Sequence, residues 1–203
     1  MRNMPEITMG LVGVSRDCFP IELTKTRLAK VVAECRKLDL NIVACNTIIE
    51  SETDALAAVD EMAEAGVDAC AIYLGNFGPE GPTTIFAETL DVPFMLCAAA
   101  EESGRDLING RGDAFCGMLS ASLNTKLRDL TPHIPQSPVG LPEQTARSIA
   151  HFFDVARVVA ALADLKVFAF GPRPQDFYAC NAPIKPLYDL GLEVMENSEL
   201  DMY

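Results

Sequence analysis

The first hundred residues alternate between two hydrophobic periods, and this alternation constrains the fold more than any other feature. Four short and nearly continuous apolar runs have the length of buried strands: residues 7–14, 40–49, 68–74 and 92–99. Between them lie segments whose apolar residues recur at helical spacing: 21–38, 55–65 and 83–90. Such alternation is typical of a parallel sheet covered by helices on both faces. It predicts a flavodoxin-like α/β unit with four or more parallel strands.

The second of these helices carries clear start and stop signals. Ser51 has the character of an N-cap, with Asp54 three residues later, and Gly66 follows the last helical residue. We therefore expect a capped helix that connects the second strand to the third.

The second half of the chain has a different pattern. A polar stretch over 101–112 reads as a linker, and residues 131–142 carry four prolines, which predict an irregular excursion. The remaining segments are predicted as two helices and two strands: 114–130, 143–164, 165–170 and 192–195. A further helix is expected to run from the loop 171–176 toward Leu190. We therefore predict two consecutive three-layer α/β units with mainly parallel sheets, over 1–100 and 101–203, the second of which need not be complete.

Composition excludes several classes of protein. The 16 Lys and Arg residues against 29 Asp and Glu residues give a net charge of −13, which disfavours binding to a nucleic-acid backbone. No apolar run reaches the roughly eighteen residues of a membrane span, and the N-terminus lacks the pattern of a signal peptide. We expect a cytoplasmic protein that binds neither nucleic acid nor membrane.

The seven cysteines do not have the pattern of a disulfide framework or a zinc site. Their number is odd, no C-x-x-C occurs, and several lie within apolar strand-like runs. The two histidines, His133 and His151, are not near a cysteine pair at ligand spacing and are predicted to be surface residues. Most of the cysteines are therefore interpreted as buried free thiols.

Candidate ligand contacts follow the first and third strands. In an open parallel sheet, the loops after the strands meet at one edge, which is where ligands bind. Arg16 follows the first strand there, and its guanidinium could bind a carboxylate, a phosphate or adjacent hydroxyls. Asn76 and Phe77 lie in the glycine- and proline-rich turn after the third strand. The alternatives are a surface ion pair between Arg16 and Asp17, and a turn that is merely a stiff connection.

Two further arginines are candidates. Pro172 and Pro174 flank Arg173, which suits an anion or hydroxyl site, although a rigid strand-to-helix turn is the alternative. Asp113 suits the N-cap of the helix that follows it, which leaves Arg111 without a structural role and raises the interest of this residue as a ligand contact.

Acidic residues and nucleotide fingerprints give no further site. The pair Glu101-Glu102 and the acidic residues near the C-terminus are interpreted as solvated, because no histidine lies near them in the sequence. Neither a G-x-G-x-x-G after the first strand nor a P-loop motif is present, so a dinucleotide or nucleotide site is poorly supported.

Four motifs together resemble the L-fucose/L-arabinose isomerase family, and most closely its shorter members. They are VSRDCFP at 14–20, FGPE at 77–80, RGDAFCGML at 111–119 and FGPRPQDF at 170–177. The similarity continues through NAPIKP at 181–186 and ENSELD at 196–201, so that it covers essentially the whole chain.

The resemblance implies a role in carbohydrate metabolism as part of an isomerase, an intramolecular oxidoreductase that interconverts aldoses and ketoses with a divalent metal, usually manganese. Family members have two N-terminal α/β domains and a C-terminal domain, and the glutamate, aspartate and histidine that bind the metal lie beyond the region matched here. The N-terminal domains supply loops that reach the sugar in a neighbouring subunit of a trimer or hexamer. The matching positions are Arg16, Asn76 and Phe77.

The expected function is therefore the substrate-loop portion of a sugar isomerase, without a cofactor of its own and inactive without the C-terminal metal-binding domain. Because family members are considerably longer, this sequence is expected to be either a piece of a longer protein or a gene for the N-terminal half. Two alternatives stay open: a stand-alone sugar or sugar-phosphate binding module, and a flavodoxin-like nucleotide binder, which the missing glycine fingerprint disfavours.

Overall fold

A computed structural model describes residues 5–101, 111–163, 165–171 and 183–202. By its internal contacts, the chain divides into two compact units. One runs from Glu6 to Ala156, and the other comprises the chain from Arg157 onwards together with Pro5, whose carbonyl oxygen accepts a hydrogen bond from Nε of Arg157 at 3.2 Å. Each unit is considered separately below.

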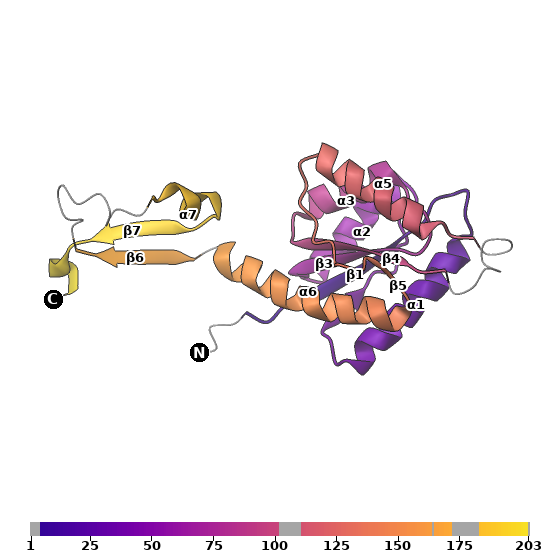
Figure 1. Cartoon of the computed structure of the whole chain (residues 1–203), viewed down its shortest axis with the longest axis horizontal. Helices are drawn as coiled ribbons and strands as arrows, with labels where there is room; N and C mark the ends of the chain where they lie inside the picture. Colours follow the sequence, from indigo (N-terminus) through magenta and orange to yellow (C-terminus); the bar gives the residue numbers. More distant parts are fainter. Residues whose placement is uncertain (1–4, 102–110, 164, 172–182, 203) are drawn as a thin grey trace. The chain divides into compact units, whose positions relative to one another are not determined.

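The larger unit is built on a five-stranded parallel sheet (Figure 1). Its strands are β1 Met9–Val14, β2 Ile42–Ala44, β3 Ala69–Leu74, β4 Phe94–Ala99 and β5 Val139–Gly140. They lie in the order β2-β1-β3-β4-β5, with every neighbouring pair parallel. This is the doubly wound order of flavodoxin-like folds, so the predicted fold class is confirmed.

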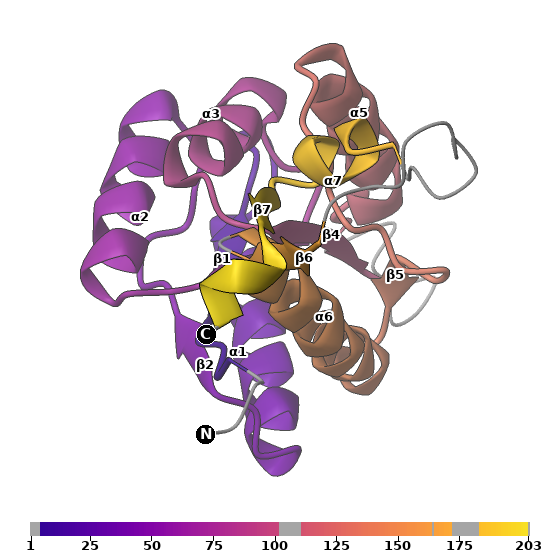
Figure 2. The ribbon, with the colours of Figure 1, turned by 90° about the vertical axis from the view of Figure 1, so that its left-hand side faces the viewer.

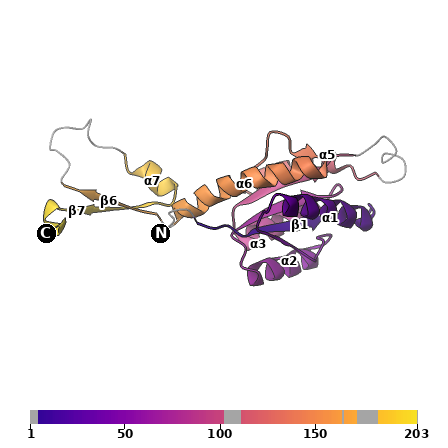
Figure 3. The same ribbon diagram turned by 90° about the horizontal axis from the view of Figure 1, so that it is seen from below.

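Helices cover both faces of this sheet, as expected for parallel strands. The helices are α1 Ile21–Lys37, α2 Glu52–Glu64, α3 Glu80–Leu90, α5 Ala114–Leu127 and α6 Pro142–Ala163. Figure 2 shows α2, α3 and α5 on one side of the sheet, with α1 and α6 on the other. On the first side, α2 packs against α3 (Figure 3), and α3 packs against α5. None of the described helices is long and apolar enough to cross a membrane.

The two-sided cover explains why the strands read as continuous apolar runs. Every residue of β1, β3 and β4 is buried. Parallel pairing aligns β1 with β3 from Met9 opposite Ala69 to Val14 opposite Leu74. The carboxyl ends of the two strands therefore lie level, and the loops that follow them start side by side.

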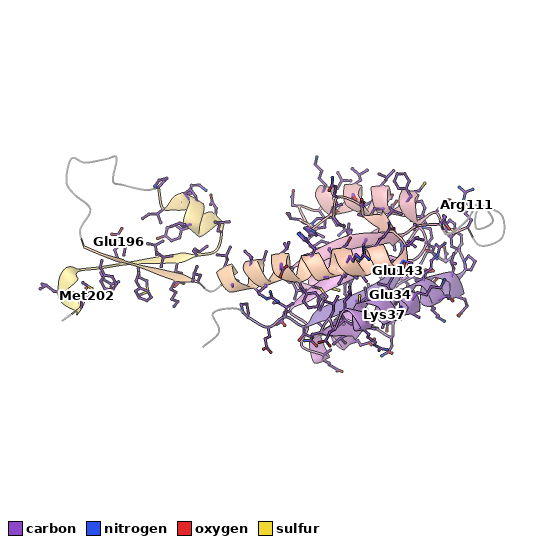
Figure 4. The ribbon with its side chains drawn as sticks, turned by 60° about the horizontal axis from the view of Figure 1, so that its bottom comes forward. Glu34, Lys37, Arg111, Glu143, Glu196 and Met202 are labelled. Carbon is purple, nitrogen blue, oxygen red and sulfur yellow. The ribbon has the colours of Figure 1, made fainter. Side chains whose placement is uncertain are left out.

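On the other face, α1 and the start of α6 approach each other through charged side chains. Figure 4 shows Glu34 and Lys37 of α1 close to Glu143 of α6. Nζ of Lys37 donates a hydrogen bond to Oε1 of Glu34, and this bond, together with the charge of Glu34 and the weaker effect of Glu143, raises the pKa of Lys37. This pair lies at the surface of the unit, with Lys37 exposed and Glu34 half-buried.

Two segments differ from the sequence expectation. The strand predicted over 40–49 is three residues long, because the carboxylate of Glu61 in α2 accepts hydrogen bonds from the backbone N–H groups of Asn46 at 2.7 Å and Thr47 at 3.2 Å. These bonds fix the chain as a loop at that point. The proline-rich stretch contains β5, a two-residue strand that adds to the edge of the sheet beside β4.

The second unit contains a two-stranded parallel sheet. Strand β6 Lys166–Phe170 pairs with β7 Glu193–Asn197, and α7 Lys185–Asp189 and the 3₁₀ turn Glu199–Met202 complete the described part. Its apolar side chains are largely exposed within this part, among them Phe168 and Phe170. Residues 114–156 contribute to the larger unit, and the predicted division of the chain at residue 100 stays a prediction.

The start of α2 provides a test of the local structure. Ser51 and Asp54 form a reciprocal capping box, as the sequence predicted in part. We expect Ser51→Ala to lower the free energy of unfolding by about 1 kcal/mol, because the N–H of Asp54 loses its acceptor. Thr53→Ala, which replaces an exposed residue in the first turn of the same helix, is the matched control and should leave stability nearly unchanged. Urea denaturation followed by circular dichroism measures both, and equal stabilities of the two variants would contradict the cap.

Candidate functional site

The loops after β1 and β3 meet at the point where the chain changes direction across the sheet. From β1 the chain passes through α1 to β2 on one side, whereas from β3 it passes through α3 to β4 on the other. In open α/β folds generally, ligands bind at such a switch point, outside the carboxyl ends of the strands. Arg16 follows β1 at this point, and Asn76 and Phe77 follow β3, so the structure brings these three predicted residues together.

Asn76 connects the two loops through a fully buried side chain. Its Oδ1 accepts hydrogen bonds from the backbone N–H of Arg16 at 2.9 Å and from that of Gly78 at 3.2 Å. Its Nδ2 donates to Oγ of Ser15 at 2.8 Å, and this hydroxyl donates to Oε1 of Glu50, also at 2.8 Å. One amide thus ties together the loops after β1 and β3, and Ser15 links them to the loop that precedes α2.

The guanidinium of Arg16 is held in a defined position above this network. Its Nε donates to the carbonyl oxygen of Gly78 at 3.1 Å, and its central carbon lies 4.6 Å from the centre of the Phe77 ring. The ring of Phe19 stacks on the same phenylalanine, with centroids 6.3 Å apart and planes 8° apart. Among the residues that the structure describes, stacking on an aromatic ring and a hydrogen bond through Nε leave the two terminal nitrogens of Arg16 as unused donors.

The alternative role of Arg16, a surface pair with Asp17, has no support in the described residues, where no ion pair joins these two side chains. The half-buried arginine instead makes its contacts with the loop after β3. A fork of two free N–H-bearing nitrogens that faces away from the ring suits a pair of adjacent oxygens.

Helix α5 packs closely against the backbone of the loop that contains Phe77. A Cβ atom placed on Gly117 would lie 1.9 Å from the carbonyl oxygen of Phe77, so this helix approaches the loop as closely as only glycine allows. One turn later, Oγ of Ser120 donates to Oε1 of Glu80, which begins α3. The backbone of the loop is therefore clamped between its own sheet edge and a helix.

A buried ion pair supports the base of the same loop, and sequence reasoning missed it. Arg27 of α1 is 4% exposed; its Nη1 donates to the carbonyl oxygen of Gly75 at 2.8 Å, and its Nη2 pairs with the carboxylate of Glu101. Glu101 also accepts hydrogen bonds from the backbone N–H groups of Gly112 at 3.2 Å and Asp113 at 3.1 Å. The expectation that Glu101 is merely solvated is therefore wrong. A charged residue within the buried face of α1 was the signal that could have revealed the pair.

The interpretation of Arg111 and Asp113 needs a similar correction. Asp113 occupies the N-cap position of α5, but with a φ of 50° and without a side-chain capping bond. Nε of Arg111 instead lies 2.7 Å from Oδ1 of Asp113, a contact that raises the pKa of Arg111. Figure 4 shows this arginine at the N-terminal end of α5. Arg111 thus has the structural partner that the sequence did not assign to it.

The remaining candidates are an arginine, a glutamate and the cysteines. Arg173 and Cys180 lie outside the described residues, and Glu102 does as well. Among the cysteines that the structure describes, Cys18 and Cys116 are exposed and the other four are buried, as predicted for most of them. Burial raises the pKa of Cys35 to about 11 and that of Cys45 to about 12, so both thiols stay protonated and unreactive at neutral pH.

A divalent metal such as manganese requires several oxygen or nitrogen ligands at one point. Nowhere in the described ranges do three His, Cys, Asp or Glu side chains converge in a way that could hold a metal ion. The described residues therefore do not fit a metal centre, and no metal-dependent step is assigned to them.

The fold and the loops at its switch point define a flavodoxin-like α/β domain with a candidate polar ligand site. The chain matches a family model described as the fucose/sulfoquinovose isomerase N-terminal domain over residues 10–163, which include the loops after β1 and β3 and all but the first residue of the five-stranded sheet. The chain belongs to this family of sugar isomerase domains. No curated protein matches it.

The Arg27–Glu101 pair can be tested by its effect on stability. Arg27→Met should lower the free energy of unfolding by about 1–3 kcal/mol, because the buried carbonyl of Gly75 and the half-buried carboxylate of Glu101 lose their partner. Lys25→Met is the matched control on the same helix, since the pair of Lys25 with Glu22 is exposed and its loss should change little. Chemical denaturation of the two variants is the measurement, and similar midpoints for both would show that the pair does not support the loop.

Proposed function

We propose that this domain supplies the substrate-contacting loops of an aldose–ketose sugar isomerase. Membership in the isomerase family supports the reaction class. The observation that carries the proposal is the guanidinium of Arg16, held on Phe77 and Gly78 with its terminal nitrogens free to donate. It lies at the switch point of the sheet, which is the usual ligand position of this architecture.

The proposed task of these residues is to bind and orient the sugar. The terminal nitrogens of Arg16 would donate to two adjacent sugar oxygens in the fork geometry that a lysine cannot reproduce. Because Nε and the stacked ring already fix the side chain, little conformational freedom is left to lose when the sugar binds. Asn76, whose Oδ1 already accepts two hydrogen bonds and whose side chain is buried, would act by holding the Arg16 loop and not by touching the sugar.

The chemical step would take place outside the described residues. Interconversion of an aldose and a ketose moves a proton between neighbouring carbons, which needs a base, and a divalent metal, when bound, supplies a Lewis acid for the oxygens. We propose that a C-terminal domain of the same enzyme supplies both groups and that Arg16 reaches the sugar from a neighbouring subunit of a trimer or hexamer. In this proposal the enzyme acts in the cytoplasm.

A second candidate is a stand-alone sugar or sugar-phosphate binding module. It is favoured by the fact that the Arg16 guanidinium is positioned entirely by residues of its own unit. Its two free nitrogens suit a phosphate group as well as a pair of hydroxyls.

Kinetics of the complete isomerase that carries this domain tests the first proposal. Arg16→Ala should lower kcat/KM by roughly ten- to a hundredfold, the equivalent of about 1.5–3 kcal/mol for a hydrogen bond to a charged group. Arg16→Lys should restore little of this loss, since lysine lacks the fork. Asp17→Ala, which changes the next, exposed residue, is the control and should keep nearly full activity.

Subunit mixing tests whether the site is shared. Arg16→Ala subunits combined with subunits that lack only the metal ligands should regain part of the activity, because some sites then contain both intact halves. Unchanged kinetics of Arg16→Ala would remove Arg16 from the substrate site. Loss of activity in the Arg16→Ala enzyme without any rescue on mixing would place Arg16 and the metal in the same subunit.

A further inference from the structure

The larger unit has a hollow that is lined by residues other than those of the loops after β1 and β3. It has a volume of about 390 Å³ and lies between the proline-rich loop before β5 and helix α6. The polar groups that line it are His133, Gln136 and Ser137 from the loop, and Arg147, Ser148 and His151 from the helix. Its size is at the lower end of the range for small-molecule pockets.

Both walls of the hollow are fixed in place. The backbone N–H of His133 donates to the carbonyl oxygen of Phe94 at 2.8 Å, and its carbonyl oxygen accepts from the N–H of Leu96 at 3.1 Å, which anchors the loop to β4. The ring of His133 stacks on Phe152 of α6, with centroids 5.3 Å apart. His133 is therefore held between β4 and α6.

The helix presents its donors on one face. Arg147 and His151 are four residues apart and thus lie one turn above each other. The rings of His133 and His151 lie 6.2 Å apart, so the two imidazoles come from opposite walls and share one hollow. Within the described part of the chain, the guanidinium of Arg147 makes no hydrogen bond or ion pair with another side chain.

The charge of the lining contrasts with that of the chain. None of the described residues that line the hollow is acidic, although the chain carries a net charge of −13. The loop over residues 131–138 contributes no charged group besides His133, and on α6 the nearest acidic residues, Glu143 and Asp154, lie one turn before Arg147 and one turn beyond His151, outside the lining. One permanent cation, two groups that become cations on protonation and two hydroxyls are suited to an anion with several oxygens.

We propose that this hollow is a binding site for a phosphate group, either as the free ion or on a small organic molecule. Arg147 binds two oxygens of the group, and the two imidazoles and the serine hydroxyls donate to the others. The volume leaves room beside the phosphate for a small organic substituent. The lining of this site does not include Arg16 or its neighbours, and the proposal does not depend on the proposed isomerase function.

The protonation of His133 gives the site a predictable pH dependence. Partial burial and the neighbouring His151 lower the pKa of His133, because both disfavour its charged form. A bound anion favours the charged form of His133, so binding takes up protons. Affinity should therefore be highest below the lowered pKa of His133 and fall as the pH rises above it toward 8.

NMR of the histidine ring protons tests the site in the full 203-residue chain, which contains two histidines. Sulfate is the first probe, because its charge is constant between pH 6 and pH 8, and sodium chloride at equal ionic strength is the reference. We expect sulfate to shift both ring signals saturably at pH 6, with about tenfold weaker binding at pH 8. Inorganic phosphate and glycerol 3-phosphate then separate the two forms of ligand: tighter binding of the ester indicates an organic phosphate, and equal binding indicates the free ion.

Two variants complete the test. Arg147→Gln should weaken sulfate binding about tenfold, as expected for loss of a charge-assisted contact. Arg36→Gln removes the same charge from an exposed position on α1 and should leave the affinity unchanged. Equal effects of the two variants, an affinity independent of pH, or shifts that chloride reproduces would each overturn the proposal.

Discussion

The buried amide of Asn76 joins two loops whose residues lie 60 positions apart in the sequence. It accepts one backbone N–H from each loop and donates to Ser15, so that three of its four hydrogen-bonding positions are used inside the protein. Such bonds are strong in a buried setting, and leaving them unmade is costly. The amide of Asn76 thus holds the backbone at Arg16 against the loop after β3.

The rest of the unit keeps this arrangement from relaxing. The buried strands β1 and β3 end level with each other, which places both loops at the same depth. Gly117 brings α5 against the carbonyl of Phe77, and Arg27 holds the carbonyl of Gly75 at the start of the same loop. Packing and hydrogen bonding therefore act on the loop from three directions, and a rigid frame of this kind suits the binding of a small polar ligand.

The sequence predicted the features that follow from hydrophobic period. Strand order, helix cover and the meeting of Arg16 with Asn76 and Phe77 all follow from parallel strands with loops at one edge. It did not predict contacts that depend on three-dimensional distance. Glu101 looks like a solvated charge in one dimension, and its partner Arg27 of α1 lies 74 positions away in the sequence. The partner of Arg111 is close in the sequence, but the sequence pattern assigns Asp113 to the N-cap of α5 and not to an ion pair. The early end of β2 likewise depends on Glu61, a residue of the following helix.

The Arg16 guanidinium is held in place by Phe77 and Gly78 before any ligand arrives. ¹⁵N relaxation at the side-chain Nε of arginine measures this directly, and the exposed Arg36 provides a reference in the same sample. We expect an order parameter for Arg16 close to that of a rigid backbone, about 0.85, and a value below about 0.6 for Arg36. An Arg16 side chain as mobile as that of Arg36 would contradict the claim.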